Sequence, residues 1–246
     1  MGTPADITSR DEATEQSADG IVVNTFEELE AEYVKEYRRA KGDKVWCIGP
    51  ISTCNKLNTD KVERCRGENG STVNDYEQYL KWLDSWEPGS VICSCLGSIC
   101  DLATWQLLEL GLGLEASSQP FIWVIRGGER SQEGVSAGVP LVTCPLYAEQ
   151  FYNEKLVMQV LGIGVSVGIE AAVTWGLEDK SGLVIKREKV KEAIEKLMDR
   201  GKQGEKRRNR ARQLGEITNR AIGVGGSSHR NIEMLIEFVI QKTRGQ

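Results

Sequence analysis

The sequence predicts an α/β fold built on a parallel sheet with flanking helices. Short, continuous apolar runs at Val91 to Cys95 and Phe121 to Ile125 have the length of buried strands. Between them, Ala103 to Ser117 carries leucines at helical spacing. The order strand, turn, helix, strand is that of the βαβ unit, which joins parallel neighbours.

The N-terminal region predicts a smaller set of elements. Gly20 to Asn24 and Val45 to Ile48 read as short buried strands, and Phe26 to Ala40 between them has helical periodicity. From Ser52 to Asn74 the chain turns polar and carries charges of both signs. We interpret this stretch as a linker or a long surface loop.

A helix opening at Asp75 precedes the βαβ pattern, which then fails after its second strand. Parallel neighbours need a crossover of about a dozen or more residues, usually a helix. The interval from Arg126 to Val139 contains four glycines and few apolar residues. It is a poor crossover, so part of the expected pattern is missing.

The stretch from Glu133 to Gln150 predicts a binding site. Pro140 and Pro145 bound a short apolar strand, and Glu149 and Gln150 begin the next helical pattern. In open parallel sheets ligands bind beyond the carboxyl ends of strands, and an acid beside an amide suits a polyhydroxyl ligand such as a sugar. The alternative is an ordinary helix start, where an acid is favoured by the helix dipole.

The C-terminal half is mainly helical. A strand is expected at Ile163 to Val167, and Ser227 or Ser228 can cap the last helix. The basic run Lys206 to Gln213 is interpreted as a solvated helix face; nucleic-acid binding is the alternative. The helices expected here are Phe151 to Leu161, Arg187 to Met198, about Glu205 to Ala221, and Ser228 to about Lys242; the tryptophans expected in the core are Trp82, Trp86, Trp105 and Trp123.

Composition narrows the function classes. The 246 residues include 31 Lys plus Arg against 36 Asp plus Glu, and this net charge of −5 disfavours nucleic-acid partners. No run of about 20 apolar residues could span a membrane, and the polar N-terminus lacks a signal-peptide pattern, so we expect a cytoplasmic protein. Seven cysteines without a CxxC pair and a single histidine, His229, predict free thiols and no metal site.

Several separated stretches resemble the plant small-molecule UDP-glycosyltransferases, closest to the branch that glucosylates flavonoids, terpenoids and hormones. The matching pieces are VNTFEELE (23–30), VWCIGP (45–50), YLKWLDSWEPGSVI (79–92), LGS (96–98), FIWVIR (121–126), EGVSAGVPLVTCPLYAEQFYNEKL (133–156) and GGSSHRNI (225–232). They follow the family's order along nearly the whole chain. The resemblance implies a GT-B fold of two Rossmann-like domains, with the sugar-nucleotide held mainly by the C-terminal one.

The resemblance also implies domains and donor contacts. Residues 1–50 correspond to a remnant of the N-terminal domain, 51–74 to the interdomain linker, and 75–246 to the nucleotide-sugar-binding domain. Glu133 matches the glutamate on the ribose, Glu149 and Gln150 the pair on the glucose hydroxyls, and Ser98 a phosphate-side serine beside Gly97. Hydroxyl and backbone amide groups at a helix start suit an anion, and glycine lets the backbone approach it closely. UDP-glucose is then a substrate, and no cofactor or metal is expected.

Large parts of the family pattern are absent from this sequence. The uracil-stacking and diphosphate-binding segments of the donor signature are missing, because Gln132 and Glu133 are adjacent where they should intervene. The catalytic histidine and its aspartate partner are missing too, and His229 matches no catalytic position. Three origins fit the junction: a variant transcript or gene prediction, an engineered deletion, or a longer molecule, whose mass would exceed 27.3 kDa.

These departures predict a family member that is inactive, or nearly so, by itself. The family reaction transfers glucose from UDP-glucose to a hydroxyl of a small metabolite with inversion, using a general base. Base stacking contributes about 1–3 kcal/mol and a charged hydrogen bond about 1.5–3 kcal/mol. Losing several such contacts weakens UDP binding by roughly 10³-fold. The alternative is a non-catalytic interaction module that pairs with a full-length relative. Missing strands would also leave open sheet edges, an aggregation hazard.

Overall fold

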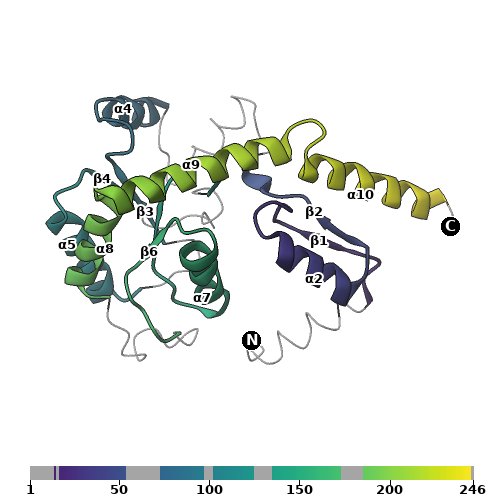
Figure 1. The fold of residues 1–246 in the computed structure, drawn as a ribbon. Helices are drawn as coiled ribbons and strands as arrows, with labels where there is room; N and C mark the ends of the chain where they lie inside the picture. The colour runs from purple at the N-terminus through teal and green to yellow at the C-terminus, as the bar shows by residue number, and fades with distance from the viewer. Residues whose placement is uncertain are drawn as a thin grey trace. The chain divides into compact units, whose positions relative to one another are not determined.

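The computed structural model describes residue 14 and residues 17–53, 73–96, 102–124, 135–172 and 185–244. The chain divides into two compact units, one made of Met1–Cys54 with Glu216–Gln246 and the other of Asn55–Gly215. Figure 1 shows the order of the elements along the chain. Each unit is described by itself.

The first unit joins segments from both ends of the chain. It contains β1 (Ile21–Val23), α2 (Ala31–Lys41), β2 (Val45–Cys47), the 3₁₀ turn Ile51–Thr53 and α10 (Ser227–Arg244). The strands β1 and β2 are parallel, with Val22 opposite Trp46. Helix α10 packs on β2, and the ring centroids of Trp46 and Phe238 lie 5.0 Å apart.

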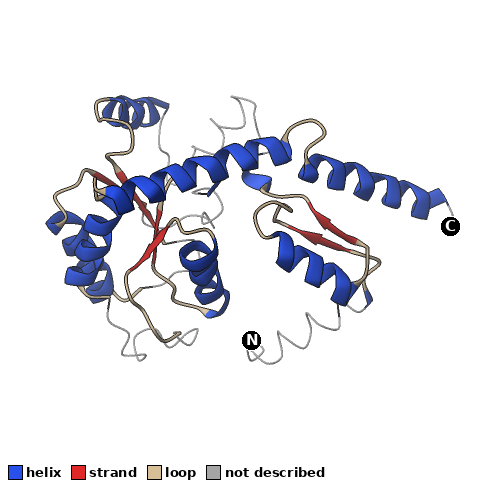
Figure 2. Cartoon of the chain, in the orientation of Figure 1, coloured by secondary structure: helices blue, strands red, loops and turns tan. Residues whose placement is uncertain are grey.

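The second unit contains most of the predicted βαβ pattern, drawn by element type in Figure 2. Its strands each align with an apolar run of the sequence, and its helices fill the intervals where apolar residues recur at helical spacing. Its elements are α4 (Val73–Asp84), β3 (Ile92–Cys95), α5 (Thr104–Ala116), β4 (Phe121–Val124), β5 (Leu141–Thr143), α7 (Ala148–Lys155), the π-helical turn Leu156–Val160, β6 (Gly164–Ser166), α8 (Arg187–Met198) and α9 (Lys202–Ile222), the last of which continues into the first unit.

The strands of the second unit pair in twos. Strand β3 is parallel to β4, and β5 is parallel to β6. Among the described strands, no ladder joins one pair to the other. The prediction of an α/β fold with parallel strands is confirmed, and the expected incompleteness of the sheet agrees with this separation.

One hydrophobic core supports both strand pairs. Buried side chains from α5, β6 and α8 form its centre, and residues from β3, β4 and β5 pack against it. Helices α5 and α8 approach closely at Gly113, where a Cβ atom would lie 2.6 Å from the Cβ of Val190. Outside the core, the guanidinium of Arg187 at the start of α8 forms an ion pair with Glu109 of α5. Hydrogen bonds that Arg187 donates to the carboxylate of Glu109 hold the pKa of Glu109 below its usual value.

Three of the expected core tryptophans are exposed, so that prediction was wrong for them. Trp82, Trp86 and Trp105 are 38%, 43% and 43% exposed, whereas Trp123 is half-buried against the core. Trp82, in the last turn of α4, and Trp86, just beyond the end of that helix, pack edge to face with ring centroids 5.9 Å apart. Apolar periodicity marks a helix face but does not say whether another element covers it.

The arginines of the basic run have structural partners. Arg207 and Arg208 donate hydrogen bonds to the carbonyl oxygens of Lys196 and Asp199, both at 2.8 Å, where α8 ends. Arg210 reaches the carbonyl of Leu161 at 3.3 Å. Cations at a helix C-terminus satisfy carbonyls that lack an intrahelical partner.

Of the helices that the structure describes, none has the length and apolar character needed to cross a bilayer.

Candidate functional site

The loop that follows β5 is fixed by burial. Pro145, Leu146 and Tyr147 are all buried, and Leu146 and Tyr147 are part of the core cluster. The hydroxyl of Thr143, at the end of β5, also hydrogen-bonds the carboxylate of Glu154 on α7. The buried Leu146 and Tyr147 therefore anchor the N-terminus of α7 just beyond the carboxyl end of β5, where open parallel sheets bind ligands, and Glu154 ties the other end of the helix to β5.

Gln150 has a structural role at this helix N-terminus. Its side-chain oxygen accepts hydrogen bonds from the backbone N–H groups of Leu146 at 2.8 Å and Tyr147 at 3.3 Å. These bonds complete half of a capping box and satisfy donors that the turn would otherwise leave unpaired. The NH₂ group of Gln150 has no partner among the described residues and remains able to donate.

Glu149 presents its carboxylate to solvent in the first turn of α7. A negative charge in this position is favoured by the helix dipole. A carboxylate accepts hydrogen bonds, whereas the adjacent Gln150 amide donates them. Together the two side chains offer the mixed acceptors and donors that a sugar's hydroxyl groups require, on a helix anchored by buried neighbours.

The structure brings only part of the predicted site together. Glu149 and Gln150 lie side by side at the start of α7, but Gly97, Ser98 and Glu133 lie outside the described residues. His229 is on α10, with its Nδ1 atom 3.5 Å from the carboxylate of Glu233 on the same helix. Across the described parts of the chain, no cluster of three or more His, Cys, Asp or Glu side chains could hold a metal ion.

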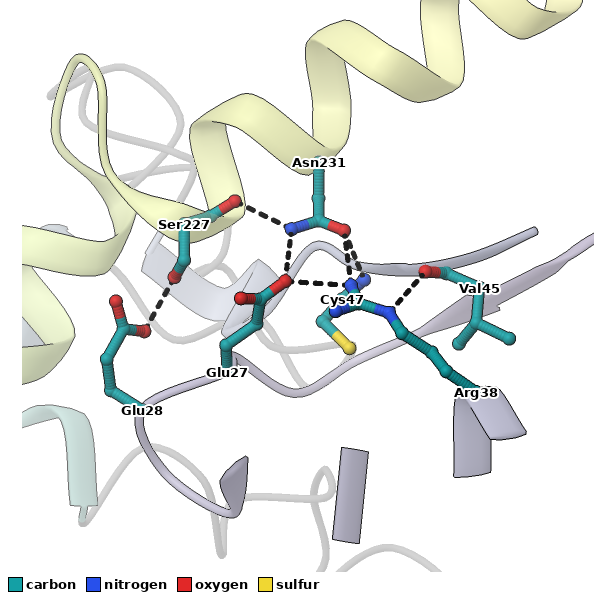
Figure 3. Close-up of polar contacts among 7 residues, drawn as sticks. All are labelled: Glu27, Glu28, Arg38, Val45, Cys47, Ser227 and Asn231. Carbon is teal, nitrogen blue, oxygen red and sulfur yellow. Dashed lines mark hydrogen bonds and ion pairs between the residues drawn. The ribbon is translucent and has the colours of Figure 1, made fainter. Parts of the chain in front are cut away.

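A second polar cluster, centred on Asn231 of α10, lies in the first unit (Figure 3). The side-chain oxygen of Asn231 accepts hydrogen bonds from the Cys47 backbone N–H at 3.2 Å and the Arg38 guanidinium at 3.1 Å. Its NH₂ group donates to Glu27 at 3.0 Å and to the carbonyl of Ser227 at 2.8 Å. All four hydrogen-bonding positions of this buried amide are used, which fixes α10 on β2.

The serines that begin α10 contribute to the same attachment. Ser227 donates to the Glu28 carboxylate and Ser228 to the carbonyl of Gly49, both at 2.6 Å. The prediction that Ser227 or Ser228 caps α10 was wrong, because the helix begins at Ser227 and the residue before it, Gly226, stands at the cap position. The stretch GGSSHRNI contained the signal for this attachment, but periodicity along one helix cannot identify partners about 180 residues away.

Charge and burial set the ionisation of this cluster. Partial burial raises the pKa of Glu27, but hydrogen bonds from Asn231 and Arg38, with the charge of Arg38, bring it below its usual value. Arg38 and Glu27 form an ion pair at 2.7 Å. Burial raises the pKa of the Cys47 thiol, which keeps this side chain neutral. The cluster is thus a satisfied structural network.

Comparison with known proteins identifies the matching family. Residues 124–202 match the family model of UDP-glucoronosyl and UDP-glucosyl transferases. Anthocyanidin 3-O-glucosyltransferase 4 of Manihot esculenta is 52% identical over 241 aligned positions, which take in 77% of this chain and 98% of that protein. UDP-glycosyltransferase 73C7 of Arabidopsis thaliana is 41% identical over 277 positions, 92% of this chain and 56% of that protein.

Solved structures give the same match. Glycyrrhiza uralensis UGT73P12, solved with glycyrrhetinic acid 3-O-monoglucuronide, has a TM-score of 0.83 and 31% identity, covering 99% of this chain and 59% of that one. Os79 from O. sativa, solved with U2F and a trichothecene, has a TM-score of 0.72 and 27% identity, covering 95% and 58%. The chain spans little more than half the length of these structures and of the Arabidopsis relative.

The alignment with the Arabidopsis relative also shows an internal difference. It extends over 277 positions, whereas this chain has 246 residues in total. Only 92% of this chain, about 226 residues, is aligned, so about 51 positions (277 less 226) of that relative have no counterpart within the aligned part of this chain. This agrees with the missing segment that the sequence predicts between Gln132 and Glu133.

Proposed function

This chain belongs to the plant UDP-glycosyltransferases, and from this premise we propose that it retains the sugar-binding end of their donor site without being an efficient catalyst alone. In this proposal residues 75–246 are the nucleotide-sugar-binding domain, 1–50 an N-terminal remnant and 51–74 the linker. The donor is UDP-glucose, and the acceptor of the intact reaction is a hydroxyl of a small plant metabolite. A flavonoid is one candidate class, because a relative is named for anthocyanidin.

The observation that carries the proposal is the pair Glu149 and Gln150 on an anchored helix. The exposed carboxylate of Glu149 and the unpartnered NH₂ group of Gln150 lie where a sugar would meet the carboxyl end of β5. In the same proposal Gly97 and Ser98 approach the diphosphate and Glu133 the ribose. Each hydrogen bond between a carboxylate and a sugar hydroxyl contributes about 1.5–3 kcal/mol. One or two such bonds are enough for weak recognition without the uracil contacts.

Calorimetric titration tests this proposal directly. UDP-glucose is expected to bind the purified chain weakly. Its affinity should be roughly 10³-fold below that of a donor bound with a micromolar Kd, so the expected Kd is near millimolar. UDP alone should bind no more tightly, because it lacks the glucose hydroxyls that Glu149 and Gln150 would contact. Tight, micromolar UDP binding, or transfer of glucose to a flavonol by the purified chain, would contradict the proposal that the donor site is only partly retained.

A non-catalytic role in pairing with a full-length relative is the second candidate. The strand pairs that no described strand joins favour it, because unpaired edges are sites of association. Co-purification with a tagged full-length relative tests this pairing, and recovery of each protein without the other would exclude the pairing. A cytoplasmic location is part of the proposal, and it agrees with the four described cysteines, none of which is in a disulfide.

A further inference from the structure

Helix α9 divides its cationic side chains between two uses. Arg207 and Arg208 donate hydrogen bonds to the carbonyl oxygens at the end of α8. Lys202, Lys206 and Arg210 follow one another at intervals of four residues, share another face of the helix, and are exposed. Neither lysine ammonium group has a partner among the described residues. The basic stretch therefore contains a structural pair and a set of cations that the fold does not use.

These three cations line a groove of about 550 Å³ between α9 and the turn at Leu161 and Gly162. The guanidinium of Arg210 is held at its wall, because the Nε atom donates to the carbonyl of Leu161 at 3.3 Å. The two terminal nitrogens of Arg210 have no partner within the described parts of the chain. The residues of α9 that line the groove recur at helical spacing and form one continuous face; they are Lys202, Glu205, Lys206, Asn209, Arg210 and Gln213.

The lining of the groove selects an anionic occupant with polar groups of its own. Three cations against the carboxylate of Glu205 give the groove a positive charge in a chain of net charge −5. The amide of Gln213 offers a donor and an acceptor. The oxygen of Asn209 accepts a hydrogen bond from Arg212 at 2.6 Å, so its NH₂ group remains as a donor. Amides of this kind suit the backbone N–H and C=O groups of a polypeptide.

We propose that this groove binds an extended acidic peptide segment of a partner protein. Residues four apart on a helix are separated by about 6 Å along its axis. Alternate side chains on one side of an extended peptide are separated by about 6.6 Å. Carboxylates at every second position of the peptide therefore pair with Lys202, Lys206 and Arg210 in turn. The accumulated mismatch over the three pairs is about 1 Å, which long basic side chains absorb.

Two other kinds of anionic partner fit the groove less well. A helical partner has its backbone groups paired internally and docks through several apolar anchors, whereas Leu161 is the one apolar side chain in the lining and is only 3% exposed. Single-stranded nucleic acid is held by cations together with aromatic rings on which the bases stack. No aromatic residue is among those described as lining this groove.

Fluorescence anisotropy with the full 246-residue chain tests the proposal. The probe is a labelled peptide of about ten residues with glutamate at every second position, and the matched control carries glutamine at the same positions. The glutamate peptide should bind at least about tenfold more tightly than the glutamine peptide. Its Kd should rise severalfold between about 50 mM and about 300 mM salt, because exposed ion pairs are screened.

Two charge-reversal variants locate the contact. Lys206→Glu replaces an attraction at the middle of the three cations with a repulsion, so the Kd should rise about tenfold or more. The Tm should stay near the native value, because position 206 is exposed and a glutamate there lies four residues from both Lys202 and Arg210. Lys189→Glu, in the first turn of α8, makes the same change of net charge outside the groove. It should change the Kd by less than about twofold.

Several results would overturn the proposal. These are no binding of the glutamate peptide, equal binding of the glutamine peptide, and equal losses in the two lysine variants. Tighter binding of a helix-forming peptide with glutamates four residues apart would identify a helical partner instead, and tighter binding of single-stranded oligo-dT would identify a nucleic acid.

The acidic-peptide groove is independent of the proposed donor site. Glu149 and Gln150 are not among the residues that line it, so UDP-glucose should not displace the labelled peptide. Displacement would overturn the groove as a separate site. Peptide binding without any UDP-glucose binding would support the groove and count against the donor site alone.

Discussion

The backbone N–H of Cys47 donates a hydrogen bond to the side-chain oxygen of Asn231, 184 positions later in the chain, at 3.2 Å. Both residues are buried, at 1% and 4% exposure. This bond joins the N-terminal part of α10 to the end of β2, so the C-terminal helix completes the N-terminal strand pair. A strand pair and one helix would otherwise be too small to form a stable unit.

Replacing Asn231 with alanine should destabilise the first unit. The change leaves the buried N–H of Cys47 without an acceptor, and an unsatisfied buried donor costs about 1–3 kcal/mol. Urea denaturation followed by circular dichroism measures the loss. Asn209→Ala, at an exposed position of α9, is the matched control and should change the free energy of unfolding by less than about 0.5 kcal/mol.

The stability of the same unit should depend on pH through Glu27. Because its pKa in the folded protein is lowered from the ordinary 4.5, folding is favoured by ionisation, and this contribution is present above that value. It is lost as pH falls below 4.5 and through the lowered pKa. Glu27→Gln should flatten the decline of Tm over this acidic range, whereas Glu237→Gln on the exposed side of α10 should leave it unchanged.

The close approach of α5 and α8 predicts that Gly113→Ala is destabilising. Alanine gains about 1 kcal/mol of helix propensity, but its Cβ would lie 2.6 Å from the Cβ of Val190 and 2.9 Å from the carbonyl oxygen of Arg187. Overpacking of this kind costs about 1–3 kcal/mol, and contact with backbone limits relaxation. The net loss expected from urea denaturation is about 1 kcal/mol.

A double-mutant cycle checks the cause of that loss. Val190→Ala alone should also destabilise, because Val190 is 2% exposed and its truncation opens a cavity. In the combined variant the new methyl at position 113 partly fills the space. The free energy of unfolding lost by the double variant should therefore be smaller than the sum of the two single losses. Simple additivity would show that the contact between these two positions is not the cause.

Glu149→Ala should weaken UDP-glucose binding and leave UDP binding unchanged. The carboxylate is proposed to accept hydrogen bonds from glucose, and losing about 1.5–3 kcal/mol corresponds to roughly 10- to 100-fold in Kd. Isothermal titration of both ligands measures the difference. Glu188→Ala, in the first turn of α8, is the control for a general loss of charge. Equal weakening of both ligands would place Glu149 away from the sugar.

Substitutions of Gln150 can separate its two roles. Gln150→Glu retains an oxygen acceptor for the N–H groups of Leu146 and Tyr147, so Tm should stay near the native value. It removes the NH₂ donor, so UDP-glucose affinity should fall. Gln150→Ala removes both functions and should lower Tm as well, by a few degrees for a loss of about 1 kcal/mol. An unchanged affinity in the glutamate variant would indicate a purely structural residue.

The identity of most elements is determined by the sequence alone. Apolar runs of three to five residues predicted the strands, including β4 and β5, and periodicity predicted α8 at its observed bounds of Arg187–Met198. The position of Glu149 and Gln150 after a short strand was also readable. These features depend on local spacing and on turn residues such as Pro140 and Pro145, which act within a few positions.

Tertiary structure alone decided how the side chains are used. It shows that the Gln150 oxygen satisfies the turn before α7, that Ser227 and Ser228 bind acceptors near the N-terminus, and that Trp82 remains exposed. It also divided the parallel strands into separate pairs. The sequence could not specify these outcomes, because a side chain's partner and its covering element depend on residues distant in the chain.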